Sequence, residues 1–316
     1  MSEARARLLR VGRWLLILGT VAAMVFIARG LDWRAFARAL RGAHLPWVLL
    51  AGGFFGVRMV FRGLIWRVCL QAEPRIGLLR LVHYTVAATA ASVLTPARAG
   101  EALRLWLLRR NHGISLSRSV GVALGEKLLD ALALLAVVLP LPWLLPALPA
   151  WVAGVVKGLL ALAPLALALA WWAARSGGGE GRIAVFLRQT RILREPRVLV
   201  QGFVACLLAW WFDLATLWAS MHAVGLHQGY GAAAFVLLAI NAALLIPSTP
   251  GNLGTLEASA VFALGVLEVA PAQAAACAFV YHAVQLIPLL LFALLNLRLF
   301  LRRREIEPRS RGARLD

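Results

Sequence analysis

The sequence predicts an all-α polytopic membrane protein, with about six full spans and two broken re-entrant helical hairpins arranged as an inverted repeat. Three observations lead to this prediction: the composition, two matched breaks in apolar sequence, and the distribution of charge. Of the 316 residues, 61% are hydrophobic, whereas soluble domains carry roughly 45–50% apolar residues. No stretch resembles a separate soluble domain, so residues 1–316 are expected to form a single integral membrane domain.

Apolar runs predict the individual spans, because about 20 apolar residues are needed to cross a bilayer. The six runs expected to cross fully are 12–29, 44–68, 118–144, 150–174, 198–224 and 273–300. Four shorter runs form two pairs, 80–95 with 101–108 and 231–247 with 253–267. The order span, span, hairpin, span therefore occurs twice, in a first half of about 1–144 and a second half of about 150–305.

Each short pair is interrupted by the same pattern, Thr-Pro-x-x-x-Gly. Proline removes a backbone donor and glycine permits a tight turn, so both pieces should end there. Lipid cannot satisfy the exposed backbone groups, so such breaks occur where they line a cavity or a buried site. A matched pair, one in each half, points to a transport site between the repeats. The residues expected to make the breaks are Thr95, Pro96 and Gly100 in the first half, and Pro247, Thr249, Pro250, Gly251 and Gly254 in the second.

Basic residues predict the orientation, since cytoplasmic loops carry an excess of Lys and Arg. The N-terminus, the loop 175–197 and the C-terminus are Arg-rich, so both termini should lie on the cytoplasmic side of the cytoplasmic membrane. Segments 140–150, 225–230 and 268–272 contain no Lys or Arg and should lie outside. The two hairpins should therefore enter from opposite faces. Basic residues at 29–41 would fall outside, and the amphipathic stretch 33–40 could instead lie in the interface.

The net charge of +19 is spread over termini and loops, which argues against a nucleic-acid partner. The three cysteines, Cys69, Cys206 and Cys277, lack metal-ligand spacing and lie in apolar stretches, as small buried hydrophobic residues do. We expect no cofactor and no metal site.

Ionisable residues inside spans are costly, and they are candidates for a site. Arg58 and Arg62 are four residues apart and share a helical face, which suits either a ligand site or an internal ion pair. In the first hairpin, Arg98, Glu101 and Arg104 follow the break at the start of a helix. Arginine donors at a helix N-terminus suit phosphate oxygens, and Glu101 could pair with one of the arginines. The alternative is a salt-bridge network that only pins the hairpin.

Carboxylates in later segments complete the candidate set. Glu126 and Asp130 lie four residues apart, with Lys127 between them, and could pair with the arginines or carry protons. Asp213 and Glu257 are further candidates, because a buried carboxylate needs a partner. His222 and His282 are expected to be hydrogen-bonded structural residues.

At these positions the chain resembles the transmembrane, flippase-type domain of the lysylphosphatidylglycerol synthases. Arg98-Ala99-Gly100-Glu101-x-x-Arg104 is similar to the family's R-x-G-E-x-x-R, and Glu126-Lys127-x-x-Asp130 is similar to its E-R-x-x-D. The stretch 247–257 is similar to its P-x-x-P-G-G-x-G-x-x-E, with Asn252 in place of a glycine. The chain resembles a stand-alone member without the synthase domain.

The resemblance implies translocation of an anionic phospholipid or a lipid-linked phosphate head group across the membrane. A membrane lipid would then be the partner, contacted by the arginines, while the carboxylates position them or couple protons. Two alternatives remain open. One is a membrane-embedded enzyme acting on a lipid-linked phosphate, although no nucleophile motif is present, and the other is a structural accessory subunit.

Overall fold

The structure is a computed structural model, and it describes most of the chain outside the two ends and a few connecting segments. The described residues are 29, 31–70, 76–95, 100–145, 150–154, 157–158, 161–162, 195–245 and 249–296. Most of the predicted spans 12–29 and 150–174 and of the predicted loop 175–197 therefore lies outside the described residues, as do Pro96, Arg98 and Pro247.

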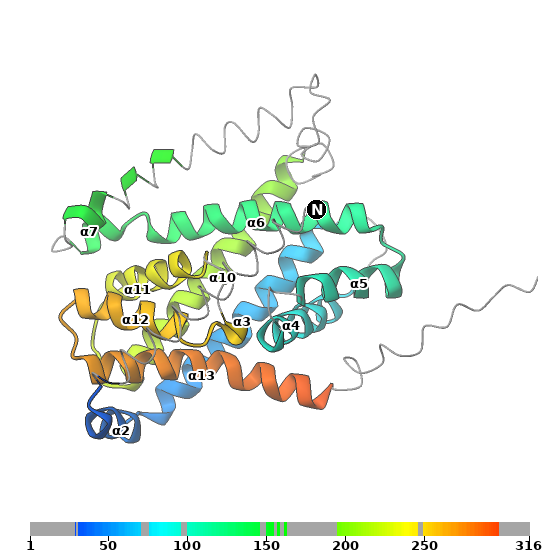
Figure 1. The fold of residues 1–316 in the computed structure, drawn as a ribbon. Helices are drawn as coiled ribbons and strands as arrows, with labels where there is room; N and C mark the ends of the chain where they lie inside the picture. The colour runs from blue at the N-terminus through cyan, green and yellow to red at the C-terminus, as the bar shows by residue number, and fades with distance from the viewer. Residues whose placement is uncertain are drawn as a thin grey trace, which may run out of the picture.

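Every regular element of the described residues is helical, and the helices follow the predicted order (Figure 1). The first half contains α2 (Trp33–Arg41), α3 (Leu45–Cys69), α4 (Leu78–Leu94), α5 (Gly100–His112), α6 (Leu116–Val138) and α7 (Leu141–Leu144). The second half contains α10 (Pro196–Ala223), α11 (Tyr230–Ala243), the 3₁₀ turn η3 (Pro250–Asn252), α12 (Thr255–Val266) and α13 (Pro271–Leu295). Within the described ranges, α3, α10 and α13 are long and apolar enough to cross a membrane. The protein is a multi-pass, all-helical membrane protein.

The two predicted breaks separate pairs of short helices. The longest of the four, α4, has 17 residues, and at about 1.5 Å per residue it rises about 25 Å, less than the hydrocarbon core of about 30 Å. Helix α4 packs against α5, and α11 packs against α12. Each pair is therefore a broken hairpin, while its entry from one membrane face remains a prediction.

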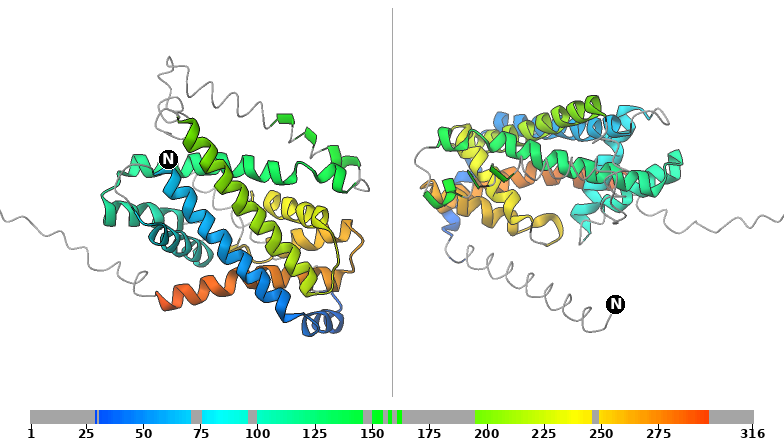
Figure 2. Two further views of the ribbon diagram at one scale, coloured as in Figure 1. Left: turned by 180° about the vertical axis from the view of Figure 1, so that it is seen from behind. Right: turned by 90° about the horizontal axis from the view of Figure 1, so that it is seen from above.

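The two halves are inverted relative to each other, as predicted. Helices α3 and α10 lie side by side along most of their length (Figure 2). They run in opposite directions, because Trp47 near the start of α3 contacts Trp218 late in α10, whereas Arg62 further along α3 lies over the earlier Trp210. Helices α6 and α13 flank the hairpins on opposite sides (Figure 1). The order long helix, hairpin, long helix thus occurs twice in opposite directions.

Glycine fixes both hairpin turns. A Cβ on Gly100 would lie 1.8 Å from the carbonyl oxygen of Ala88, so only glycine lets α5 start against α4. In the second turn Gly251 and Gly254 have φ of 70° and 84°, in the region that glycine favours. Asn252 has φ of 58°, and asparagine tolerates this left-handed conformation better than most residues. Asn252 therefore preserves the turn where the family motif has glycine.

Two details refine the sequence predictions. The run 118–144 was expected to be one span, but α6 ends at Val138 and the four-residue α7 follows. Pro140 and Pro142 explain the difference, because proline supplies no donor and restricts the residue before it. The stretch 33–40 does form a helix, α2, with Asp32 accepting hydrogen bonds from the backbone of Arg34 and Ala35. The three cysteines are buried free thiols, as expected.

Candidate functional site

A cavity of about 320 Å³ lies where the two hairpins and the long helices meet. The turns of the hairpins adjoin each other there, since Gly251 in the second turn lies beside Val93 near the end of α4. The wall carries an unusual number of ionisable groups for a site among apolar helices. Those that line it are Arg58, Arg62, Glu101, Arg104, Glu126, Lys127, Asp130, Asp213, Tyr281 and His282.

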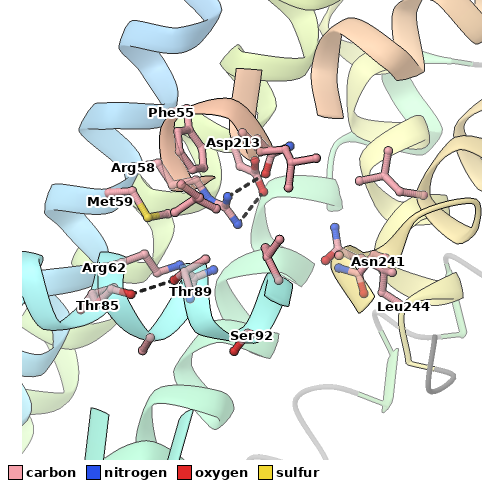
Figure 3. Close-up of a pocket in the computed structure, with 18 of the residues that line it drawn as sticks. Phe55, Arg58, Met59, Arg62, Thr85, Thr89, Ser92, Asp213, Asn241 and Leu244 are labelled. Carbon is pink, nitrogen blue, oxygen red and sulfur yellow. Dashed lines mark hydrogen bonds and ion pairs between the residues drawn. The ribbon is translucent and has the colours of Figure 1, made fainter. Parts of the chain in front are cut away.

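Arg58 on α3 joins the two long helices of the second half (Figure 3). Its Nη2 lies 3.2 Å from Asp213 Oδ2 on α10, and its Nη1 donates to Gln285 Oε1 on α13 at 3.2 Å. Asp213 is 2% exposed, and it also accepts a hydrogen bond of 3.0 Å from the Tyr281 hydroxyl. The carboxylate is therefore fixed from two sides.

Arg62, one turn further along α3, pairs with Asp130 on α6. The distance from Nη1 to Oδ1 is 2.6 Å, and the indole Nε1 of Trp210 donates to the same carboxylate oxygen at 2.8 Å. The Arg62 guanidinium also lies 5.4 Å from the centre of a Trp210 ring, a distance that allows a cation–π interaction.

Arg104 on α5 and Glu126 on α6 form the most buried of these pairs. They are 8% and 4% exposed, and their Nη2 and Oε2 atoms are 2.9 Å apart. The indole of Trp66 donates to the same Glu126 oxygen at 2.7 Å, and the Arg104 guanidinium lies 4.0 Å from the centre of a Trp66 ring. An arginine, a carboxylate and an aromatic donor thus form each of the three clusters.

Two further ion pairs hold the return helix of each hairpin to the next long helix. Glu101 on α5 lies 2.7 Å from Lys127 Nζ on α6. Glu257 on α12 lies 2.6 Å from His282 Nδ1 on α13, and its other oxygen accepts from the Gly254 backbone N–H at 2.7 Å. Glu257 therefore ties the second hairpin turn to α13.

Two guanidinium donors in the cavity wall keep unused hydrogen-bonding capacity. Arg58 Nε and Arg104 Nε are buried and have no hydrogen-bond partner among the described residues. A buried donor without a partner is costly, and a ligand that offers acceptor oxygens would satisfy it. Two buried donors in residues of the cavity wall therefore have no partner in the described part of the chain.

The structure brings together most of the residues singled out from the sequence. Nine of them meet around the cavity or support its wall: Arg58, Arg62, Glu101, Arg104, Glu126, Lys127, Asp130, Asp213 and Glu257. Arg98 lies outside the described residues. In the described ranges, no group of three or more His, Cys, Asp or Glu side chains could hold a metal ion.

Sequence reasoning gave too little weight to four residues. His282 was expected to be only structural, yet it lines the cavity and pairs with Glu257. Trp66, Tyr281 and Gln285 bind the charged groups, but tryptophan and tyrosine in apolar stretches are usually packing residues. The spacing of Tyr281 and Gln285, four residues apart on one helical face, was the available signal.

Comparison with known families gives one match over nearly the whole chain. The family model described as the lysylphosphatidylglycerol synthase TM region matches residues 13–293. Comparison with curated proteins gives no match.

Proposed function

Because the chain belongs to the family of the lysylphosphatidylglycerol synthase transmembrane region, we propose that it translocates the phosphate-bearing head group of an anionic lipid across the cytoplasmic membrane. The partner is then a membrane lipid. The protein acts as a transporter rather than an enzyme, with both termini on the cytoplasmic side.

The observation that carries this proposal is the charged cavity between the two hairpins. Its volume of about 320 Å³ falls within the range of about 300–1,000 Å³ that is usual for small-molecule sites. A head group could enter it while the acyl chains stay in lipid. Arg58 Nε and Arg104 Nε are buried and have no hydrogen-bond partner among the described residues, and guanidinium groups bind phosphate well.

The ion pairs explain how such a site could exist among apolar helices. A charge in a membrane interior is costly unless it is paired, and Arg58, Arg62 and Arg104 each have a carboxylate partner. Each of these three arginines is then already balanced by a carboxylate, and the head group displaces water rather than a bound counter-ion. The two hairpins, entering from opposite faces, would open the cavity to each side in turn.

A reconstituted system tests the proposal. Purified protein in liposomes is supplied with a fluorescent anionic phospholipid, and a membrane-impermeant quencher reports the fraction exposed outside. Transfer should be faster than in protein-free vesicles, and Arg58→Gln and Arg104→Gln should each slow it by about tenfold, the effect of about 1.4 kcal/mol. Arg80→Gln is the matched control, since Arg80 is exposed on α4 and does not line the cavity.

Two results would count against the proposal. Folded protein that transfers neither anionic phospholipids nor polyprenyl phosphates would overturn it. Mass spectrometry of the lipid after incubation separates transport from chemistry, because a covalently changed lipid would favour the alternative of a membrane-embedded enzyme.

A further inference from the structure

The two hairpins are held by equivalent ion pairs that differ in one chemical property. Each pair joins a glutamate on the return helix to a cation on the following long helix: Glu101 to Lys127, and Glu257 to His282. Lysine stays protonated at physiological pH, whereas imidazole gains and loses a proton between about pH 5 and 8. The second pair thus contains an imidazole where the first contains a lysine.

The charges around the cavity show why this difference matters. In the described part of the wall, the permanently charged cations and the carboxylates are equal in number. The four cations are Arg58, Arg62, Arg104 and Lys127, and the four carboxylates are Glu101, Glu126, Asp130 and Asp213. Helix α4 contributes only uncharged side chains to the wall, and α2, which also packs on α13, contributes none. Among the described residues, the remaining charge at the site is that of Glu257 and His282.

We propose that His282 and Glu257 form a proton site, and that one proton moves with each anionic head group. This inference rests on the proposed translocation of an anionic lipid. With neutral His282 the site carries the single negative charge of Glu257, which repels an anion. With protonated His282 the site is neutral, so an anionic head group and a proton bind more tightly together than separately. Thermodynamic linkage requires that the proton raises the affinity for the head group by the same factor as the head group raises the affinity for the proton.

The hydrogen bonds identify the atom that takes up the proton. A carboxylate only accepts, so His282 Nδ1 carries the hydrogen that it donates to Glu257 Oε1 at 2.6 Å. Nε2 is then the basic nitrogen, on a side chain that lines the cavity. A proton from water on one face binds Nε2 as the head group enters, and it returns to water on the other face as the head group leaves. No bond of the lipid is broken.

The site is also placed to move the hairpin. Glu257 bonds both His282 and the backbone N–H of Gly254, at the turn of the second hairpin. The Glu257 carboxylate accepts a hydrogen bond from His282 in both states, and protonation of His282 adds the attraction of opposite charges. Loss of the proton therefore loosens the contact between α12 and α13.

The experiment measures lipid transfer and proton movement in the same vesicles. Liposomes contain a pH-sensitive dye and a fluorescent anionic phospholipid, and an imposed pH gradient should drive net lipid transfer in the direction of proton flow. His282→Lys copies the Lys127 pair and keeps the charge of the site constant. Its transfer should change less than about twofold as the pH is raised, whereas that of the unmodified protein should fall about tenfold or more once the proton is lost. His222→Gln is the control, since His222 bonds a backbone carbonyl of α10 and does not line the cavity.

The outcomes separate the coupling from transport itself. Transfer by the unmodified protein without proton movement would overturn the coupling and leave the proposed function standing, whereas absence of transfer would overturn both. If His282→Lys is not folded by circular dichroism and gel filtration, His282→Gln replaces it and should abolish gradient-driven transfer, because it removes the group that binds the proton. Proton uptake when detergent-solubilised protein binds the anionic lipid gives a second readout, and no uptake at about pH 7, within the imidazole range, would contradict the proposal.

Discussion

Removing one partner of the Arg104–Glu126 pair should destabilise the protein far more than removing both. The charged atoms are 2.9 Å apart and both side chains are buried. At an effective dielectric constant of about 20, two unit charges at this distance attract by about 6 kcal/mol. Part of this attraction offsets the cost of removing both groups from water. Replacing one partner of the buried pair should therefore lower the free energy of unfolding by about 3–5 kcal/mol.

A double-mutant cycle measures the effect. Glu126→Gln keeps an oxygen that can accept from Trp66 but leaves Arg104 as an uncompensated buried charge. The single variants Glu126→Gln and Arg104→Gln should each lose about 3–5 kcal/mol of unfolding free energy, because each leaves a buried charge without its partner. The double variant should lose less free energy than either single variant, because it leaves no buried charge without a partner. Unfolding by sodium dodecyl sulfate in mixed micelles, followed by circular dichroism, gives these free energies.

The exposed pair Glu101–Lys127 provides the control. These side chains are 43% and 49% exposed, so Glu101→Gln should cost no more than about 1 kcal/mol. The reasoning is refuted if the loss of the double variant equals the sum of the losses of Glu126→Gln and Arg104→Gln within about 0.5 kcal/mol. That margin is the one expected for independent sites. It is also refuted if Glu101→Gln costs as much as Glu126→Gln.

Three further substitutions test the hairpins and the aromatic donors. Gly100→Ala should lower thermal stability and abolish lipid transfer, because the added Cβ would overlap the backbone of α4. Gly53→Ala is the control and should be tolerated, since nothing lies within 4 Å of the added carbon. Gly254→Ala should cost about 1–2 kcal/mol by the same unfolding assay, because φ is 84° there, and an unchanged stability would contradict the left-handed turn. Trp210→Phe keeps an aromatic ring but removes the donor to Asp130, so it should cost about 1 kcal/mol and slow transfer, and unaltered transfer would show that this hydrogen bond does not position the arginine.

Sequence patterns predicted the helices well because their causes are local. The apolar runs predicted the ends of α3, α10 and α13 to within a few residues, apart from the C-terminal end of α13. The repeated Thr-Pro-x-x-x-Gly pattern located both hairpin turns. Run length failed at the end of α6, where apolar prolines continue the hydrophobic run but cannot continue the helix.

The pairing of the charges could not be predicted in the same way. Spacing along one helix showed that Glu126 and Asp130 share a face, but it could not show that one meets Arg104 and the other Arg62. Those choices depend on how α3, α5 and α6 pack together, which involves contacts between residues far apart in the sequence. Glu101 illustrates the limit, because its partner Lys127 lies on a neighbouring helix.

The difference between the two hairpins is best explained by the charge of the lipid. If both return helices were held by lysine, the site would be neutral at every stage, and an anion would carry its full charge across the membrane. If both were held by histidine, two protons could enter, and the site would range from neutral to doubly negative, which would move two protons with a singly charged head group. One permanent cation, Lys127, and one titratable partner, His282, allow the site to alternate between a neutral and a singly negative state. A site with these two states can bind an anion when it is protonated and release it when it is not, which suits a head group that carries one negative charge.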